Sequence, residues 1–179
     1  MIRAFVALEL SGEIQRRLAE AQDVFRSSSA RLTLVDPDLI HITVKFLGDV
    51  DAGQIPQIKD ALRQIPFSPF TVTAGEVTVN NRNRPHTIWC AIDDAGRGQQ
   101  LLSAIETVLG PLGIAPETHR FLPHATIARV KVADPSLFPA LRRLEGTTYG
   151  SCTVTCLKLK KSTLTPKGPV YEDLLEVKW

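Results

Sequence analysis

Two short stretches of the sequence each carry a histidine and a threonine two residues apart. The first begins at His41 and includes Thr43, and the second begins at His124 and includes Thr126. Both stretches are rich in β-branched and apolar residues, which favours β-strands. Side chains two residues apart on a strand point to the same face. Each stretch therefore presents one imidazole and one hydroxyl group together.

Two imidazoles that meet in one site suit acid–base chemistry. Histidine titrates near pH 6.5, so a pair can hold one neutral ring as general base and one protonated ring as general acid. This arrangement suits in-line displacement at phosphorus, in which one ring deprotonates water and the other protonates the departing oxygen. A cyclic 2′,3′-phosphodiester is a fitting substrate, because its strained ring opens without a metal ion. The residues leave both assignments open, so that either His41 or His124 serves as the acid and the other as the base.

Three further side chains are candidates for phosphate contacts. The hydroxyl groups of Thr43 and Thr126 can donate hydrogen bonds to nonbridging phosphate oxygens, and Arg129 can neutralise charge in the transition state. By strand alternation, however, Arg129 falls on the face opposite His124, so a bend or twist of the strand has to bring it into the site. The same alternation places Lys45 on the face of His41, where we expect it at the rim.

The alternatives to a catalytic role differ between these residues. One histidine on a strand is more often structural, but two copies in matched contexts favour catalysis. The threonines are also good strand formers. His86 and His119 lie outside both stretches, so we expect them at the surface.

The remaining sequence alternates between strand and helix patterns. In the first half we expect strands at 2–10, 31–36, 40–47 and 70–79, and helices at 14–25 and 55–65. In the second half we expect strands at 87–93, 124–129, 152–161 and 170–178, and helices at 101–112 and 135–144.

The two histidine stretches lie 83 residues apart, and this spacing indicates an internal repeat. The same shift sets Phe5 beside Ile88 and Ile88 beside Tyr171. Element types coincide, and no linker divides the halves. We therefore expect an α+β fold formed by one two-lobed domain over residues 1–179. It is a pseudo-symmetric duplication in which antiparallel sheets are backed by helices and the active-site cleft lies between the lobes.

Composition places further limits on the chain. Its 179 residues, 44% of them hydrophobic, suffice for one domain with a sizeable core. The net charge of +2 is too small to indicate nonspecific coating of nucleic acid. The three cysteines lack CxxC spacing, so we expect buried, reduced thiols. No apolar run approaches the ~20 residues that span a bilayer, and we expect a cytoplasmic monomer.

Two basic segments outside the histidine stretches leave RNA contact open. Arg82 and Arg84 lie in a polar loop, for which a solvated turn is the favoured interpretation. Lys158, Lys160 and Lys161 follow the alternation of an exposed strand edge.

The paired stretches resemble the HxTxx[F/R] motifs of the two-histidine phosphoesterase superfamily. The branch that the chain resembles is RNA 2′,3′-cyclic phosphodiesterase, also called 2′-5′ RNA ligase. The resemblance runs nearly end to end and rests on four further segments, which are Arg3 to Leu8, Phe46 to Gly48, Phe121 to His124 and Ser162 to Tyr171.

The resemblance implies metal-free opening of a terminal cyclic phosphate to a 2′-phosphate, and a possible reverse ligation through a 2′-5′ bond. It matches His41 and His124 to the catalytic histidines, and Thr43, Thr126 and Arg129 to phosphate contacts. The implied partners are cyclic-phosphate nucleotides or RNA ends, tRNA halves among them, with no cofactor.

Three other functions remain as alternatives. The enzyme could act on another cyclic nucleotide or phosphodiester. It could instead be a noncatalytic RNA-end-binding protein, although arginine and lysine bind phosphate without a titrating histidine. A metallohydrolase is disfavoured, because two imidazoles fall short of the three protein ligands that a catalytic zinc site uses.

Overall fold

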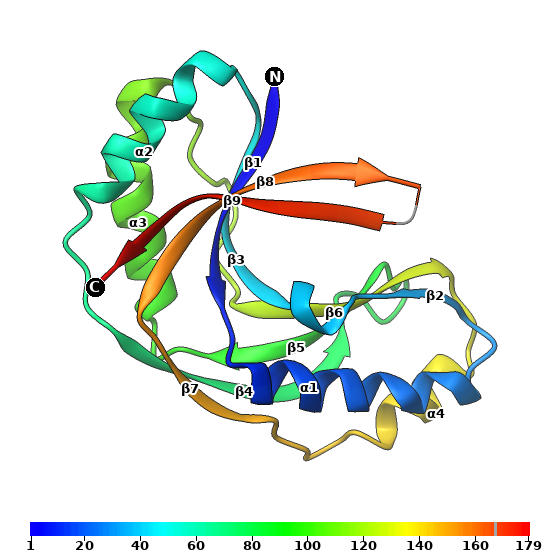
Figure 1. The fold of residues 1–179 in the computed structure, drawn as a ribbon. Coiled ribbons are helices and arrows are strands. Elements are labelled where there is room, and N and C mark those ends of the chain that lie inside the picture. Colours follow the sequence, from blue (N-terminus) through cyan, green and yellow to red (C-terminus); the bar gives the residue numbers. More distant parts are fainter. Residues whose placement is uncertain (167) are drawn as a thin grey trace.

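The computed structural model describes residues 1–166 and 168–179, and Figure 1 shows its fold. Lys167, which belongs to one of the resembling segments, lies outside the described residues. The strands are β1 (Ile2–Glu9), β2 (Arg31–Leu34), β3 (His41–Val50), β4 (Phe70–Val79), β5 (Thr87–Asp93), β6 (His124–Val132), β7 (Gly150–Val154), β8 (Cys156–Thr165) and β9 (Gly168–Lys178). The α-helices are α1 (Gly12–Ala21), α2 (Ile55–Arg63), α3 (Arg97–Leu109) and α4 (Leu137–Arg142).

The described strands form one curled antiparallel sheet. Its order is β7-β4-β5-β6-β3-β1-β8-β9, and β2 pairs with the outer part of β6. One half of the sheet is β7-β4-β5-β6 and the other is β3-β1-β8-β9. The two histidine strands, β3 and β6, are the neighbours that join these halves, through the pairing of Ile42 with Ala125. The expectation of two antiparallel halves is confirmed, and the halves are continuous.

The helices cover the outer face of the curled sheet (Figure 1). Helix α1 contacts β7 of the opposite half, whereas α3 contacts α2 and β3. The hydroxyl of Ser11 accepts a hydrogen bond from the backbone N–H of Ile14 at 3.3 Å and so caps the start of α1. The chain therefore crosses between the halves where β1 leads into α1 and where β5 leads into α3, and these two crossings tie the halves together.

The core lies between the sheet and these helices. Leu18 of α1, Ile58 of α2 and Leu101 of α3 are fully buried in it. Burial of such a side chain contributes roughly 1.5–3 kcal/mol. No helix among the described residues is long and apolar enough to cross a membrane.

The structure corrects the expected strand over 152–161. The chain forms two strands there, with a break at Thr155, because β7 pairs with β4 in one half and β8 pairs with β1 in the other. The internal repeat is likewise confirmed only in part. Phe5 and Ile88 both lie on strands that flank a histidine strand, but Tyr171 lies on β9, which pairs with β8 instead.

Candidate active site

The junction between β3 and β6 brings the predicted site residues together. Ile42 and Ala125 are paired across it, and both are buried in the core. In an antiparallel pair of strands, the residues that flank such a pair also lie opposite each other, with their side chains on the other face. Opposed Cβ atoms in such pairs are about 4.5–5.5 Å apart. We call the resulting group the central cluster; it consists of His41 opposite Thr126 and Thr43 opposite His124.

Backbone carbonyl groups hold both imidazole rings in the same orientation. The Nδ1–H of His41 donates a hydrogen bond to the carbonyl oxygen of Leu39 at 2.7 Å, and the Nδ1–H of His124 donates to that of Leu122, also at 2.7 Å. Because a carbonyl oxygen only accepts, Nδ1 carries the proton in each ring. Nε2 is then the reactive nitrogen. In His41 it lies 3.0 Å from the hydroxyl oxygen of Thr43.

Burial shifts the pKa of both histidines downward. Loss of hydration is the main cause at His41, and the positive charge of Lys160 acts in the same direction. Loss of hydration also lowers the pKa of His124, assisted by the positive charge of Arg129. Both rings are therefore neutral at pH 7 in the free protein. A bound phosphate carries negative charge, which favours protonation of one of them.

A β-bulge in β6 brings Arg129 to the site. Thr126 and Ala128 pair with β5, and Ile127 between them has no partner on that strand. An extra residue of this kind reverses the alternation of side chains beyond it. Arg129 therefore points to the same face as His124, and its Nη1 donates a hydrogen bond to the hydroxyl oxygen of Thr87 at 3.1 Å. The sequence analysis required a bend or twist of the strand to bring Arg129 to the face of His124, and the bulge at Ile127 supplies it.

Strand β3 has the same bulge at Val44, and there it removes a residue from the site. Lys45 follows the bulge and points into the core, with its side chain only 1% exposed. Its Nζ lies 3.1 Å from Oε1 of Glu106 on α3 and donates a hydrogen bond to the carbonyl oxygen of Ala115 at 2.8 Å. The expectation that Lys45 lies at the rim is wrong.

Aromatic rings pack against both histidines. Phe5 stacks on the imidazole of His41 with 5.2 Å between ring centroids, and Tyr171 meets the same imidazole edge-on at 5.4 Å. Trp89 packs on His124 at 4.1 Å. The sequence analysis assigned none of these three rings to the site. Trp89 is only half-buried within a strand of mostly buried residues, and a large aromatic side chain in such a place is the feature that could have pointed to the site.

Two of the three lysines of β8, Lys158 and Lys160, are held in a ring of ion pairs, and the third, Lys161, pairs with Glu172. Strand β8 lies between β1 and β9, so the prediction that it forms an exposed edge is wrong. Both carboxylates, Glu9 of β1 and Asp173 of β9, contact both ammonium groups. The distances from Lys158 are 3.0 and 2.7 Å, and those from Lys160 are 2.9 and 2.6 Å. Lys158 and Lys160 are therefore neutralised by carboxylates close to His41.

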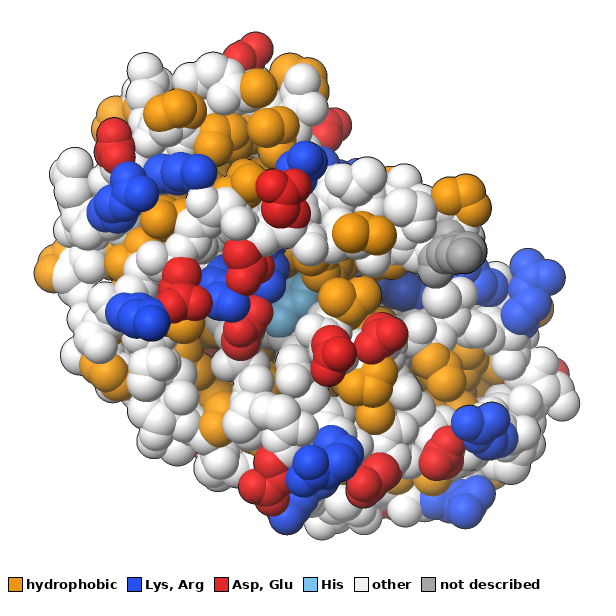
Figure 2. Space-filling model, viewed as in Figure 1, with side chains coloured by type: hydrophobic (Ala, Val, Ile, Leu, Met, Phe, Trp, Pro, Cys, Tyr) orange, Lys and Arg blue, Asp and Glu red, His pale blue; other side chains and the backbone are white. Residues whose placement is uncertain are grey.

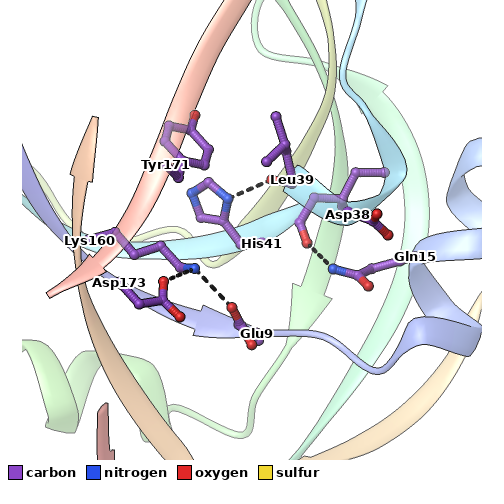
Figure 3. Close-up of a pocket in the computed structure, with 9 residues that line it drawn as sticks. Glu9, Gln15, Asp38, Leu39, His41, Lys160, Tyr171 and Asp173 are labelled. Carbon is purple, nitrogen blue, oxygen red and sulfur yellow. Dashed lines mark hydrogen bonds and ion pairs between the residues drawn. The ribbon is translucent and has the colours of Figure 1, made fainter. Parts of the chain in front are cut away.

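A cavity of about 380 Å³ opens beside this ring of ion pairs. Figure 2 shows the hollowed surface, with a histidine at its bottom and acidic and basic side chains gathered next to it. Figure 3 shows the residues around the cavity, which are Glu9, Gln15, Asp38, Leu39, Ile40, His41, Lys160, Tyr171 and Asp173. His41 therefore belongs both to the central cluster and to the wall of this cavity.

The other candidates from the sequence lie apart from the central cluster. His86 and His119 are exposed, and His119 makes a hydrogen bond with Thr118. Arg82 and Arg84 are exposed in the loop after β4. Cys90 is buried, whereas Cys152 and Cys156 are half-buried, and all three thiols are free. Within the described residues, no group of three or more His, Cys, Asp or Glu side chains is arranged to hold a metal ion.

The sequence is similar to those of known proteins over nearly the whole chain. The model of the family described as LigT like Phosphoesterase matches residues 8–89 and 93–171. The RNA 2′,3′-cyclic phosphodiesterase of Aeropyrum pernix is 32% identical over 90% of this chain and 94% of its own. That of Archaeoglobus fulgidus is 29% identical over 97% of this chain and 98% of its own.

Solved structures have the same fold. The TT0787 protein of Thermus thermophilus superposes with a TM-score of 0.79 at 27% identity, over 99% of this chain and 97% of its own. E. coli LigT in complex with 3′-AMP gives a TM-score of 0.78 at 23% identity, over the same shares of the two chains. The sequence match and the paired histidine strands agree, and the chain belongs to the LigT-like phosphoesterase family.

Proposed function

We propose that this protein is an RNA 2′,3′-cyclic phosphodiesterase that opens a terminal cyclic phosphate to a 2′-phosphate, with His41 and His124 as general acid and base. The observation that carries this proposal is the central cluster, in which two imidazoles with identical proton positions lie on paired strands. The activity named for the relatives from A. pernix and A. fulgidus supports the same reaction.

The reaction needs one proton removed and one supplied. Nε2 of His124 takes a proton from water, and the water oxygen forms a new bond to phosphorus. The bond from phosphorus to the ribose O3′ breaks on the opposite side, and Nε2–H of His41 protonates that oxygen. Because the bond to O2′ stays intact, the product is a 2′-phosphate. A 5′-hydroxyl in place of water gives a 2′-5′ linkage by the same steps.

The threonines and the arginine bind the phosphate in this mechanism. Thr43 and Thr126 donate hydrogen bonds to the nonbridging oxygens, and Arg129 stabilises the negative charge that grows on them. The position of Arg129 beyond the bulge, next to His124, supports this role. One half of the sheet supplies two of these five residues and the other half supplies three, so residues 1–179 act as one catalytic unit.

The substrate class follows from this chemistry. RNA ends with a 2′,3′-cyclic phosphate, including those of cleaved tRNA, and the corresponding mononucleotides all present the strained ring. A monomer suffices for the reaction, because a single chain provides both histidines.

The direct test is incubation with a 2′,3′-cyclic nucleotide and with a short RNA that ends in one, in excess EDTA, with phosphorus NMR of the product. A 2′-phosphate is the expected product. Turnover only without the chelator would contradict the metal-free mechanism. Tight binding without turnover would favour an RNA-end-binding protein, and turnover of a different cyclic phosphodiester alone would favour the other enzyme class.

A further inference from the structure

We infer that the cavity beside His41 is a nucleobase subsite that selects adenine and cytosine over uracil and guanine. This inference rests on the proposed function and extends it to the identity of the terminal nucleotide. It depends on the place of the cavity, on its charge and on two polar side chains in its wall.

The place of the cavity suits the base of the reacting nucleotide. His41 forms part of its wall, and the Nε2 of that ring is turned toward Thr43 and the central cluster. A nucleotide whose phosphate lies at the central cluster can therefore place its base in the cavity. A volume of about 380 Å³ falls in the range of small-molecule sites. Tyr171 adds an aromatic surface to the same wall.

The charge of the cavity disfavours a phosphate group. Three carboxylates line it, from Glu9, Asp38 and Asp173. Those of Glu9 and Asp173 are paired with the ammonium groups of Lys158 and Lys160, so the carboxylate of Asp38 supplies the excess negative charge. The wall therefore offers one negative charge that is unpaired within the described residues, together with hydrogen-bond acceptors. It favours an uncharged ligand that presents N–H donors.

Two side chains keep acceptor atoms available on one side of the cavity. The Nε2 of Gln15 donates a hydrogen bond to the carbonyl oxygen of Ile40 at 2.9 Å, which fixes the amide so that its Oε1 remains an acceptor. Asp38 lies next to Gln15, as Figure 3 shows. Among residues 1–166 and 168–179, no side chain forms an ion pair or hydrogen bond with the carboxylate of Asp38. Glu9 and Asp173, by contrast, are both held by lysines.

These acceptors distinguish the four bases. Adenine and cytosine carry an exocyclic amino group that donates to a carboxylate, whereas uracil and guanine present a carbonyl oxygen at the corresponding position of the base edge. A carbonyl oxygen facing Asp38 is repelled and leaves both groups without a hydrogen bond. Discrimination by one such contact corresponds to about 10-fold or more in kcat/KM.

The test compares the four 2′,3′-cyclic nucleoside monophosphates as substrates of the wild-type protein, of Asp38→Asn and of Asp36→Asn. The wild type is expected to have a kcat/KM about 10-fold or more higher for the adenosine and cytidine nucleotides than for the uridine and guanosine nucleotides. Asp38→Asn replaces an acceptor oxygen by a donor, so this ratio is expected to fall toward one. Asp36→Asn removes the same charge two residues away and still caps its turn, so the wild-type ratio is expected to remain.

Binding of the four 2′-nucleotide products by calorimetry gives a second measurement, which does not depend on turnover. Equal kcat/KM and equal affinities for all four bases would overturn the subsite and leave the proposed function standing. An unchanged preference in Asp38→Asn would also overturn it. Absence of turnover together with base-selective binding would instead overturn the proposed function alone.

Discussion

Strands β3 and β6 are alike in backbone and differ in what surrounds them. Both begin with a histidine whose ring is held by the carbonyl group two residues earlier, and both have a bulge after the threonine. Their burial patterns agree over nine residues. The feature that the two strands share is therefore the geometry that presents an imidazole and a hydroxyl group.

The differences between the strands begin beyond the bulge. The first position carries Lys45 in β3 and Ala128 in β6, and the next carries Phe46 and Arg129. A buried cation thus fastens β3 to α3, whereas an exposed cation of β6 stands beside the reacting groups. We therefore propose that the two halves have different tasks: β6 supplies positive charge to the phosphate, and β3 anchors the sheet to α3.

The largest predicted effect tests what the strands share. His41→Ala and His124→Ala are each expected to lower kcat by about 10²–10⁴-fold, because each removes a general acid or base. Steady-state kinetics on a 2′,3′-cyclic nucleotide measures the loss. His119→Ala, which removes an exposed histidine outside the central cluster, is the matched control and is expected to keep the wild-type rate. A near-normal rate in either cluster variant would remove that residue from the mechanism.

The next effect tests the position at which the strands differ. Arg129→Ala is expected to lower kcat by about 10²–10³-fold, the scale of one lost charge-stabilising donor. Lys131→Ala removes an exposed cation two residues further along β6 and serves as the control for net charge. Equal, small losses in both variants would show that Arg129 acts only through the general electrostatic field.

A third variant makes β3 resemble β6 in the core. Lys45→Ala introduces the residue found at the equivalent position of β6 and leaves Glu106 without its buried partner. Because the side chain of Glu106 is 25% exposed, the expected loss is about 1–3 kcal/mol in the free energy of unfolding, below the full cost of a broken buried pair. Urea unfolding measures it. A loss within about 0.5 kcal/mol, the usual range of surface substitutions, would show that the ion pair does not anchor the sheet.

The smallest effect concerns the pH profile. Burial lowers the pKa of both histidines, so each ring stays neutral until the pH falls below the usual range of histidine. The general base therefore becomes active at a lower pH than an ordinary histidine would. The general acid of the free enzyme likewise loses its proton at a lower pH than an ordinary histidine. The profile of kcat/KM is therefore expected to be bell-shaped with its maximum below about pH 6.5. A maximum above pH 7 would contradict the pKa directions of the free enzyme.

Much of this site could be predicted from spacing alone. A histidine and a threonine two residues apart share a strand face whatever the surrounding fold, so His41 with Thr43 and His124 with Thr126 followed from the sequence. The bulge in each strand could not be predicted in this way, because pairing with the neighbouring strands determines it. One unpaired residue in β6 carries Arg129 into the site, and one in β3 carries Lys45 out of it.

Two other differences between the predicted and the observed structure come from contacts between residues far apart in the sequence. The alternating lysines of β8 led to the prediction of an exposed strand edge. Their carboxylate partners could not be recognised from the local sequence, because Glu9 lies far away in the sequence and Asp173 lies on the next strand. The division of 152–161 into two strands depends equally on pairing with β4 and β1. Local alternation predicts which residues share a face, and tertiary pairing decides which face is buried.

The central claim is that His41 and His124 act together in one transition state. The most direct test compares the rates of His41→Ala, His124→Ala and the double variant on the same 2′,3′-cyclic nucleotide in EDTA. Residues that act as a unit give strongly non-additive losses, so the double variant is expected to react about as slowly as the slower single variant. A loss in the double variant equal to the product of the two single losses would contradict joint action of the two histidines.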